Sequence, residues 1–130
     1  PTAIEQARQH QEYRAYVSTV VQGGVAVVSG ILGLEGCRVS RVECTNRLSE
    51  ASSQVSGMQR DLAATPAPDC LNAADQRLQD ALGFQQKGLD TAREGVVAQN
   101  RVQLVQGLLL TAVGLWRAGQ AIVSGRQADC

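Results

Sequence analysis

A long uncharged apolar stretch lies in the first third of the chain and constrains its fold most. The eighteen residues from Val17 to Leu34 carry no charge, and from residue 20 onward their only clearly polar side chains are Gln22 and Ser29. A stretch of this length is typical of a buried helix or of the shortest helices that span a membrane. In a chain of 130 residues, it raises the question of what covers so much apolar surface.

The spacing of the apolar residues indicates an all-α protein. They recur at intervals of three and four rather than two, and the sequence contains no Asn-Gly or Asp-Gly hairpin turn. We therefore expect one helical domain over 1–130. Its helices are predicted at about 3–34, at 45–63, from Asp69 to the region of 95–101, and at 101–125.

Capping and loop-forming residues mark the predicted helix ends. Thr2-Ala3-Ile4-Glu5 has the pattern of a capping box, so the first helix should begin at Ala3. Gly33 and Gly36 lie on either side of the point where the apolar pattern ends, so we predict a turn or kink around 35–44. The two prolines in the Thr65–Asp69 segment cannot continue a helix, and Asp69 is a candidate N-cap for the third helix.

Each predicted helix has an apolar face that should point inward. The first helix has Tyr13, Val17, Val20, Gly24, Val27, Ile31 and Leu34. The second has Leu48, Ala51, Val55, Met58 and Leu62, and the third has Leu71, Leu78, Leu82, Leu89, Ala92 and Val96. The fourth has Val102, Val105, Leu109, Ala112, Trp116, Gly119 and Val123.

Two arrangements of these helices fit the pattern, and the cysteines favour one. A four-helix up-down-up-down bundle places Cys37 beside Cys44, and Cys70 beside Cys130, so both pairs can form disulfides. In the alternative, one long α-helical hairpin closed by the 65–69 proline loop, Cys70 and Cys130 would lie roughly 80 Å apart. We favour the bundle. An even set of cysteines in a small chain also suggests an exported protein, in the periplasm, outside the cell or associated with the envelope.

The first and fourth helices carry more apolar surface than a bundle helix needs. Each has a second apolar row beside the first, including Val28 on the first helix. Each also has a row of small residues, which suggests close approach of another backbone. The residues that we single out for interaction are Gly23, Ala26, Val28, Gly30, Gly33, Gly107, Gly114, Trp116 and Ala121. The surface could contact copies of the chain, a partner protein or lipid, or the two helices could cover each other. We expect Val20–Leu34 to be covered partly by the fourth helix and partly by something outside the chain.

No catalytic, cofactor-binding or metal-binding motif stands out. His10 lies in a polar stretch and is far in sequence from every cysteine, so we interpret it as a surface residue rather than a zinc ligand. Twelve basic and twelve acidic residues give no net charge, which disfavours binding to nucleic acid. We therefore expect neither an enzyme nor a cofactor-dependent protein.

The sequence as a whole favours a structural or interaction role. We expect an exported subunit of a homo-oligomeric, filamentous (pilus-like) or cell-envelope assembly, with contacts through the helices at 3–34 and 101–125. One alternative is a discrete periplasmic helical binding or inhibitor module. A second alternative is a membrane-inserting or pore-forming helical protein, with the same two helices facing lipid.

Overall fold

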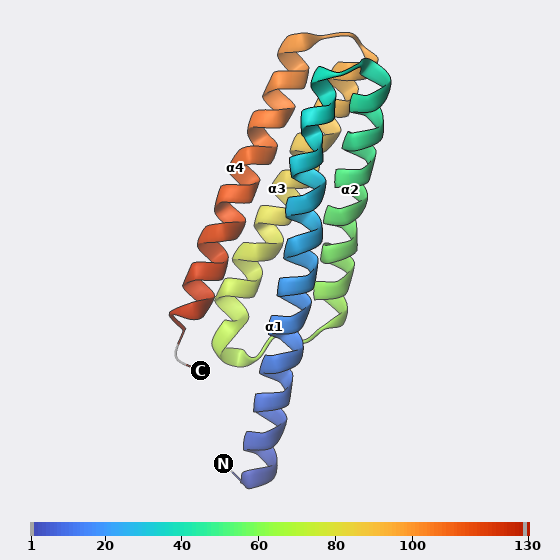
Figure 1. The fold of residues 1–130 in the computed structure, drawn as a ribbon. Coiled ribbons are helices and arrows are strands. Elements are labelled where there is room, and N and C mark those ends of the chain that lie inside the picture. Colours follow the sequence, from blue (N-terminus) through green and yellow to red (C-terminus); the bar gives the residue numbers. More distant parts are fainter. Residues whose placement is uncertain (1, 129) are drawn as a thin grey trace.

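A computed structural model describes residues 2–128 and 130 and confirms an all-α four-helix bundle (Figure 1). The helices are α1 (Ala3–Leu32), α2 (Arg41–Ala64), α3 (Asn72–Val97) and α4 (Arg101–Arg126). Short 3-10 turns, η1 (Gly33–Arg38) and η2 (Asp69–Leu71), lie before α2 and α3. Successive helices run in opposite directions, and the start of α1 projects beyond the other three (Figure 1). The long hairpin is therefore not the fold.

Side-chain caps fix the starts of three helices. Thr2 caps α1 as predicted, because its hydroxyl accepts the backbone N–H of Glu5 at 3.2 Å. Ser40 and Asn100 cap α2 and α4 by accepting from the backbone N–H three residues on, at 3.0 and 3.1 Å. The prediction for Asp69 is wrong: it begins η2, and α3 starts at Asn72 with no side-chain cap.

The inward faces predicted for α2 and α3 are correct. All five predicted residues of α2 and all six predicted residues of the third helix are buried, Leu71 from η2 and the rest from α3. On α1, by contrast, Val27 is the one residue of the predicted face that is fully buried, and Tyr13 and Val17 are each 37 % exposed. The second and third helices therefore supply most of the core.

The inward face predicted for α4 is wrong. Val102, Val105, Leu109, Trp116 and Val123 are all exposed. The buried residues of α4 are small instead: Gly107, Thr111, Gly114, Ala118 and Ala121. The helix has turned its narrow row of small residues inward because these residues let its backbone approach α3. Its larger apolar side chains remain outside as a result.

The backbones of α3 and α4 are in direct contact along their length. A Cβ atom added at Gly107 would lie 2.2 Å from the backbone nitrogen of Ala92. One added at Gly88 would lie 2.6 Å from the backbone nitrogen of Thr111, and one at Gly95 would lie 2.5 Å from that of Leu104. In these contacts the residue numbers on α3 fall as those on α4 rise, so the two helices are antiparallel in a fixed register.

One polar side chain is enclosed in this contact region without a partner. Gln85 of α3 is fully buried beside Gly114, and neither its amide nitrogen nor its amide oxygen makes a hydrogen bond within the described residues. An unpaired buried polar group usually costs about 1–3 kcal/mol. Gln85 therefore weakens the closed bundle.

Gln85→Met should raise the free energy of unfolding by about 1–2 kcal/mol, because methionine keeps the unbranched shape and removes the unpaired polar atoms. Urea denaturation followed by circular dichroism measures the change. Gln76→Met, on the exposed side of the same helix, is the control and should shift the value by less than about 0.5 kcal/mol. A loss of stability in Gln85→Met alone would mean that the amide has a partner in solution.

Candidate functional site

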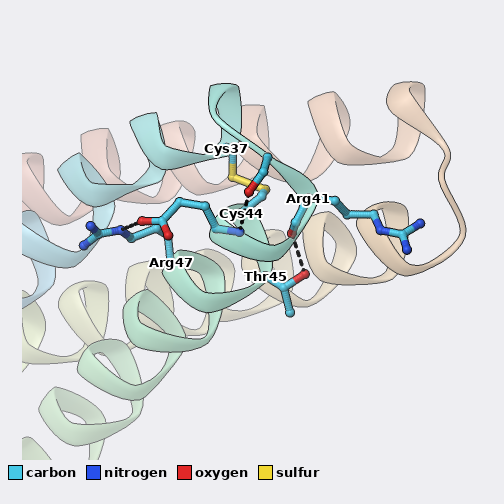
Figure 2. The surroundings of a disulfide bond; sticks show 7 residues. Cys37, Arg41, Cys44, Thr45 and Arg47 are labelled. Carbon is cyan, nitrogen blue, oxygen red and sulfur yellow. Dashed lines mark hydrogen bonds and ion pairs between the residues drawn. A yellow bond between two sulfur atoms is a disulfide. The ribbon is translucent and has the colours of Figure 1, made fainter.

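Two disulfides form the pairs predicted from the sequence. Cys37 is bonded to Cys44 across the turn between α1 and α2, and Cys70 is bonded to Cys130 between the start of η2–α3 and the end of the chain. Figure 2 shows the first bond, with Arg47 turned away from it to pair with the Glu43 carboxylate at 2.8 Å. Two disulfides in a chain with no free cysteine indicate an oxidising environment.

The glycines of the small-residue row, Gly23 and Gly30 on α1 and Gly33 in η1, face α2, whereas Ala26 is half-buried. A Cβ added at Gly23 would lie 2.7 Å from Cγ of Met58, and one at Gly30 would lie 3.1 Å from Cα of Ala51. These glycines therefore serve contacts within the chain. The expectation that the fourth helix covers part of Val20–Leu34 is also wrong, because α2 is the helix that packs closely against this stretch.

The row on α4 (Gly107, Gly114 and Ala121) faces α3 and is buried. These residues also serve an internal contact rather than an external one. Sequence reasoning recognised that this row required a close backbone, but it missed the matching row on α3. Ala81, Gly88 and Gly95 recur at heptad spacing and are all buried, so a search for small-residue heptads on both helices would have paired α3 with α4.

Val28 and Trp116 remain exposed, at 40 % and 70 % of their surface. Around them lies a set of exposed apolar side chains on α1 and α4 that we call the outer face. On α1 it comprises Val17, Val21, Val25, Val28 and Leu32. On α4 it comprises Val102, Val105, Leu109, Val113, Trp116 and Val123.

The two most apolar helical segments are therefore the least covered. Ala3–Arg38 and Arg101–Arg126 are each long and apolar enough to cross a membrane by length and composition. Only 11 % of the most apolar eighteen-residue window of the first is buried, and 28 % of that of the second. A core helix of a soluble protein would be mostly buried, so the outer face is not an ordinary core.

A groove lies between α1 and α4 over α3, toward the end of the bundle at which α4 finishes. Its volume is about 310 Å³, and its lining is mostly apolar, with Val20, Leu78 and Ile122 among its walls. Tyr16 also lines it and donates a hydrogen bond to Asp75 at 2.6 Å. Burial, together with this hydrogen bond and the charge of Asp75, raises the pKa of Tyr16 above its ordinary value, so the phenol stays protonated.

The described residues contain no cluster of His, Cys, Asp or Glu that could hold a metal ion. His10 is exposed on α1 and lines a hollow with Pro68 and Cys70. The salt bridges of the described chain are on α2, where Arg47 pairs with Glu43 and Glu50, and Arg60 with Asp61. The distinguishing features of the protein surface are therefore the outer face and the groove. No protein-family model, curated protein or solved structure matches the chain.

Proposed function

We propose that this protein is a structural or interaction subunit that associates with copies of itself through the outer face of α1 and α4. The observation that carries the proposal is the low burial of the two most apolar segments, 11 % and 28 % of their windows. Soluble monomers rarely expose a continuous apolar patch of more than a few hundred Å². Eleven exposed apolar side chains, in one row on each of the two helices, favour a surface covered by another molecule.

The location of the charges supports the same proposal. The ion pairs of Arg47 and Arg60 are on α2 rather than on α1 or α4. On α4, the guanidinium of Arg117 lies 4.6 Å from the ring centroid of Phe84 in α3, so it is directed toward α3. The outer face between Val17 and Leu34 therefore has no charge that would oppose association with another apolar surface.

The disulfides support an exported location, in the periplasm, outside the cell or on the envelope. An envelope or filament subunit in such a compartment would gain two things from this fold. The bonds hold the α1–α2 turn and the end of α4 in place, and the outer face is free for contact. This proposal includes filamentous and closed oligomeric assemblies of the chain.

A lipid-facing role is the second candidate, because one observation favours it. The uncharged stretch from Val17 to Leu34 has a helical length of about 27 Å, close to the thickness of a bilayer core. Against it, α2 and α3 carry charged outer faces along the same bundle, so α1 and α4 would have to lie on or enter lipid without them. Detergent dependence of the oligomeric state separates the two candidates.

Val28→Glu should dissociate the assembly while the helices stay folded, because Val28 lies on the outer face and is 40 % exposed. Size-exclusion chromatography with light scattering measures the mass of wild type and variant, with and without detergent, and circular dichroism measures helicity. Ser29→Glu is the matched control, since it places the same charge on the neighbouring exposed polar position. Its mass should equal that of the wild type.

Three results would oppose the proposal. A wild-type protein that is a stable monomer without detergent would leave the outer face uncovered. A wild type that stays in solution only with detergent would favour the lipid-facing role. Unfolding of Val28→Glu, with a monomeric wild type, would mean that the stretch acts as ordinary core.

A further inference from the structure

The groove between α1, α3 and α4 has the size and lining of a small-molecule site. Ligand sites are typically concave, largely apolar and about 300–1,000 Å³ in volume, with a few polar groups that orient the ligand. The groove has about 310 Å³ and runs from Tyr13 to Val21 along α1, which is about 12 Å along the helix axis. It is therefore long and narrow, as a single alkyl chain is.

The polar groups of the groove are gathered toward one end. Tyr13 and Arg126 line the end nearest the finish of α4, whereas Val21 and Leu78 line the other end. Arg126 is the single charged residue in the lining, and it forms no salt bridge within the described chain. A guanidinium favours a planar anion such as a carboxylate, to which it can donate two hydrogen bonds.

The acidic groups nearest to the groove are already engaged or lie outside its lining. Asp75 accepts hydrogen bonds from Tyr16 at 2.6 Å and from Gln79 at 2.7 Å. A larger hollow of about 980 Å³ lies between the start of α1 and the Pro68–Cys70 segment. It is lined by both Arg8 and Glu12, so it favours neither an anionic nor a cationic ligand. Arg126 carries the one charge among the residues that line the narrow groove, and the Asp75 carboxylate is hydrogen-bonded to Tyr16 of that lining.

We propose that this groove binds a single-chain carboxylate amphiphile, with its alkyl chain between α1 and α4 and its carboxylate on Arg126. The tail replaces water against the valine and leucine walls. The head group accepts hydrogen bonds from the guanidinium at the open end, where it stays partly solvated. This inference goes beyond the proposed assembly. The groove is formed within one chain, but Val17 and Val21 belong both to its lining and to the outer face, so binding is tested in a dissociated variant as well as in the wild type.

Decanoate is the probe, and isothermal titration calorimetry on the oxidised protein without detergent, below the micelle concentration, measures binding. Decanoate should bind saturably, at least about tenfold more tightly than decyltrimethylammonium, which has the same tail and the opposite charge. Arg126→Gln should weaken decanoate about tenfold or more, as expected for loss of charge-assisted hydrogen bonds, and should not weaken the cation.

A pair of tryptophan variants tests the location. Val21→Trp places a large side chain in the groove and should weaken decanoate at least about tenfold. Val25→Trp, one turn further along the same exposed row but outside the groove lining, should bind as the wild type does. Ile122→Trp repeats the test from α4, so the result does not depend on the folding of one variant.

Equal affinity for the two probes, no effect of Arg126→Gln, or equal effects of Val21→Trp and Val25→Trp would overturn the proposal. So would the absence of saturable binding of decanoate to the wild type. Titration of Val28→Glu separates this inference from the proposed function. Decanoate binding that persists when assembly is lost leaves the groove site standing, and intact assembly without decanoate binding removes the groove site alone.

Discussion

Gly107→Ala should lower the free energy of unfolding by about 3 kcal/mol or more, although it adds a single methyl group. The new Cβ would lie 2.2 Å from the backbone nitrogen of Ala92 and 2.6 Å from the carbonyl oxygen of Gly88. Both atoms belong to the backbone of α3 and cannot rotate away, so α3 and α4 must separate. Overpacking of a core typically costs 1–3 kcal/mol, and more where rigid atoms collide. Urea denaturation followed by circular dichroism measures the loss.

Gly119→Ala is the matched control on the same helix. A Cβ at Gly119 meets nothing within 4 Å, so the substitution should stabilise the protein by up to about 1 kcal/mol through helix propensity. The two variants therefore make the same chemical change with opposite expected signs. If Gly107→Ala were as stable as Gly119→Ala, α3 and α4 would not be in backbone contact.

Removal of the Cys70–Cys130 disulfide by substitution of both residues with alanine should cost about 4 kcal/mol. The bond closes a loop with a sequence separation of 60, and the loss of chain entropy in the unfolded state grows with the logarithm of loop length. The Cys37–Cys44 bond closes a loop with a separation of 7, so its removal should cost about 2.5 kcal/mol. Thermal and urea unfolding of the two double variants give the comparison.

The informative result is which disulfide, when removed, lowers the free energy of unfolding more. If the double alanine variant of the short loop were the less stable one, contacts in the folded state would outweigh loop entropy. Cys44 is the residue through which this could happen, since it is 2 % exposed within the core, whereas Cys70 is exposed. A variant with serine at position 44 would then be less stable still, because the hydroxyl would be buried.

The fold could be predicted where each helix has one apolar face. On α2 and α3 the residues of that face, such as Leu48 and Leu82, are separated from charged positions by the helical period, so burial has one solution. The capping residue Thr2 and the prolines at 66 and 68 fixed boundaries for equally local reasons. The cysteine pairs could be predicted from the bundle. Its antiparallel helices bring together the two sides of the first turn, and the start of the third helix and the end of the fourth.

The rotation of α4 could not be predicted from hydrophobicity. Leu109 and Trp116 are more apolar than Gly107 and Gly114, yet they are exposed while the glycines are buried. The row of small residues on the fourth helix did indicate a close backbone, but it does not by itself name the neighbour. The close approaches of Gly88 to Thr111 and of Gly107 to Ala92 show that α3 is the neighbour. The groove was not predicted either, because it is formed by residues from three helices.

The disulfides also divide the chain in a way that has a biochemical consequence. Cys37–Cys44 lies within the α1–α2 hairpin, and Cys70–Cys130 closes the α3–α4 hairpin, so neither joins one hairpin to the other. Their covalent link is the segment 65–68, while side-chain hydrogen bonds such as Gln86 to Ser52 cross between them. A single proteolytic cleavage in 65–68 would thus release two covalently separate fragments. The two hairpins would then be held together by a bimolecular association, so the stability of the bundle would depend on fragment concentration.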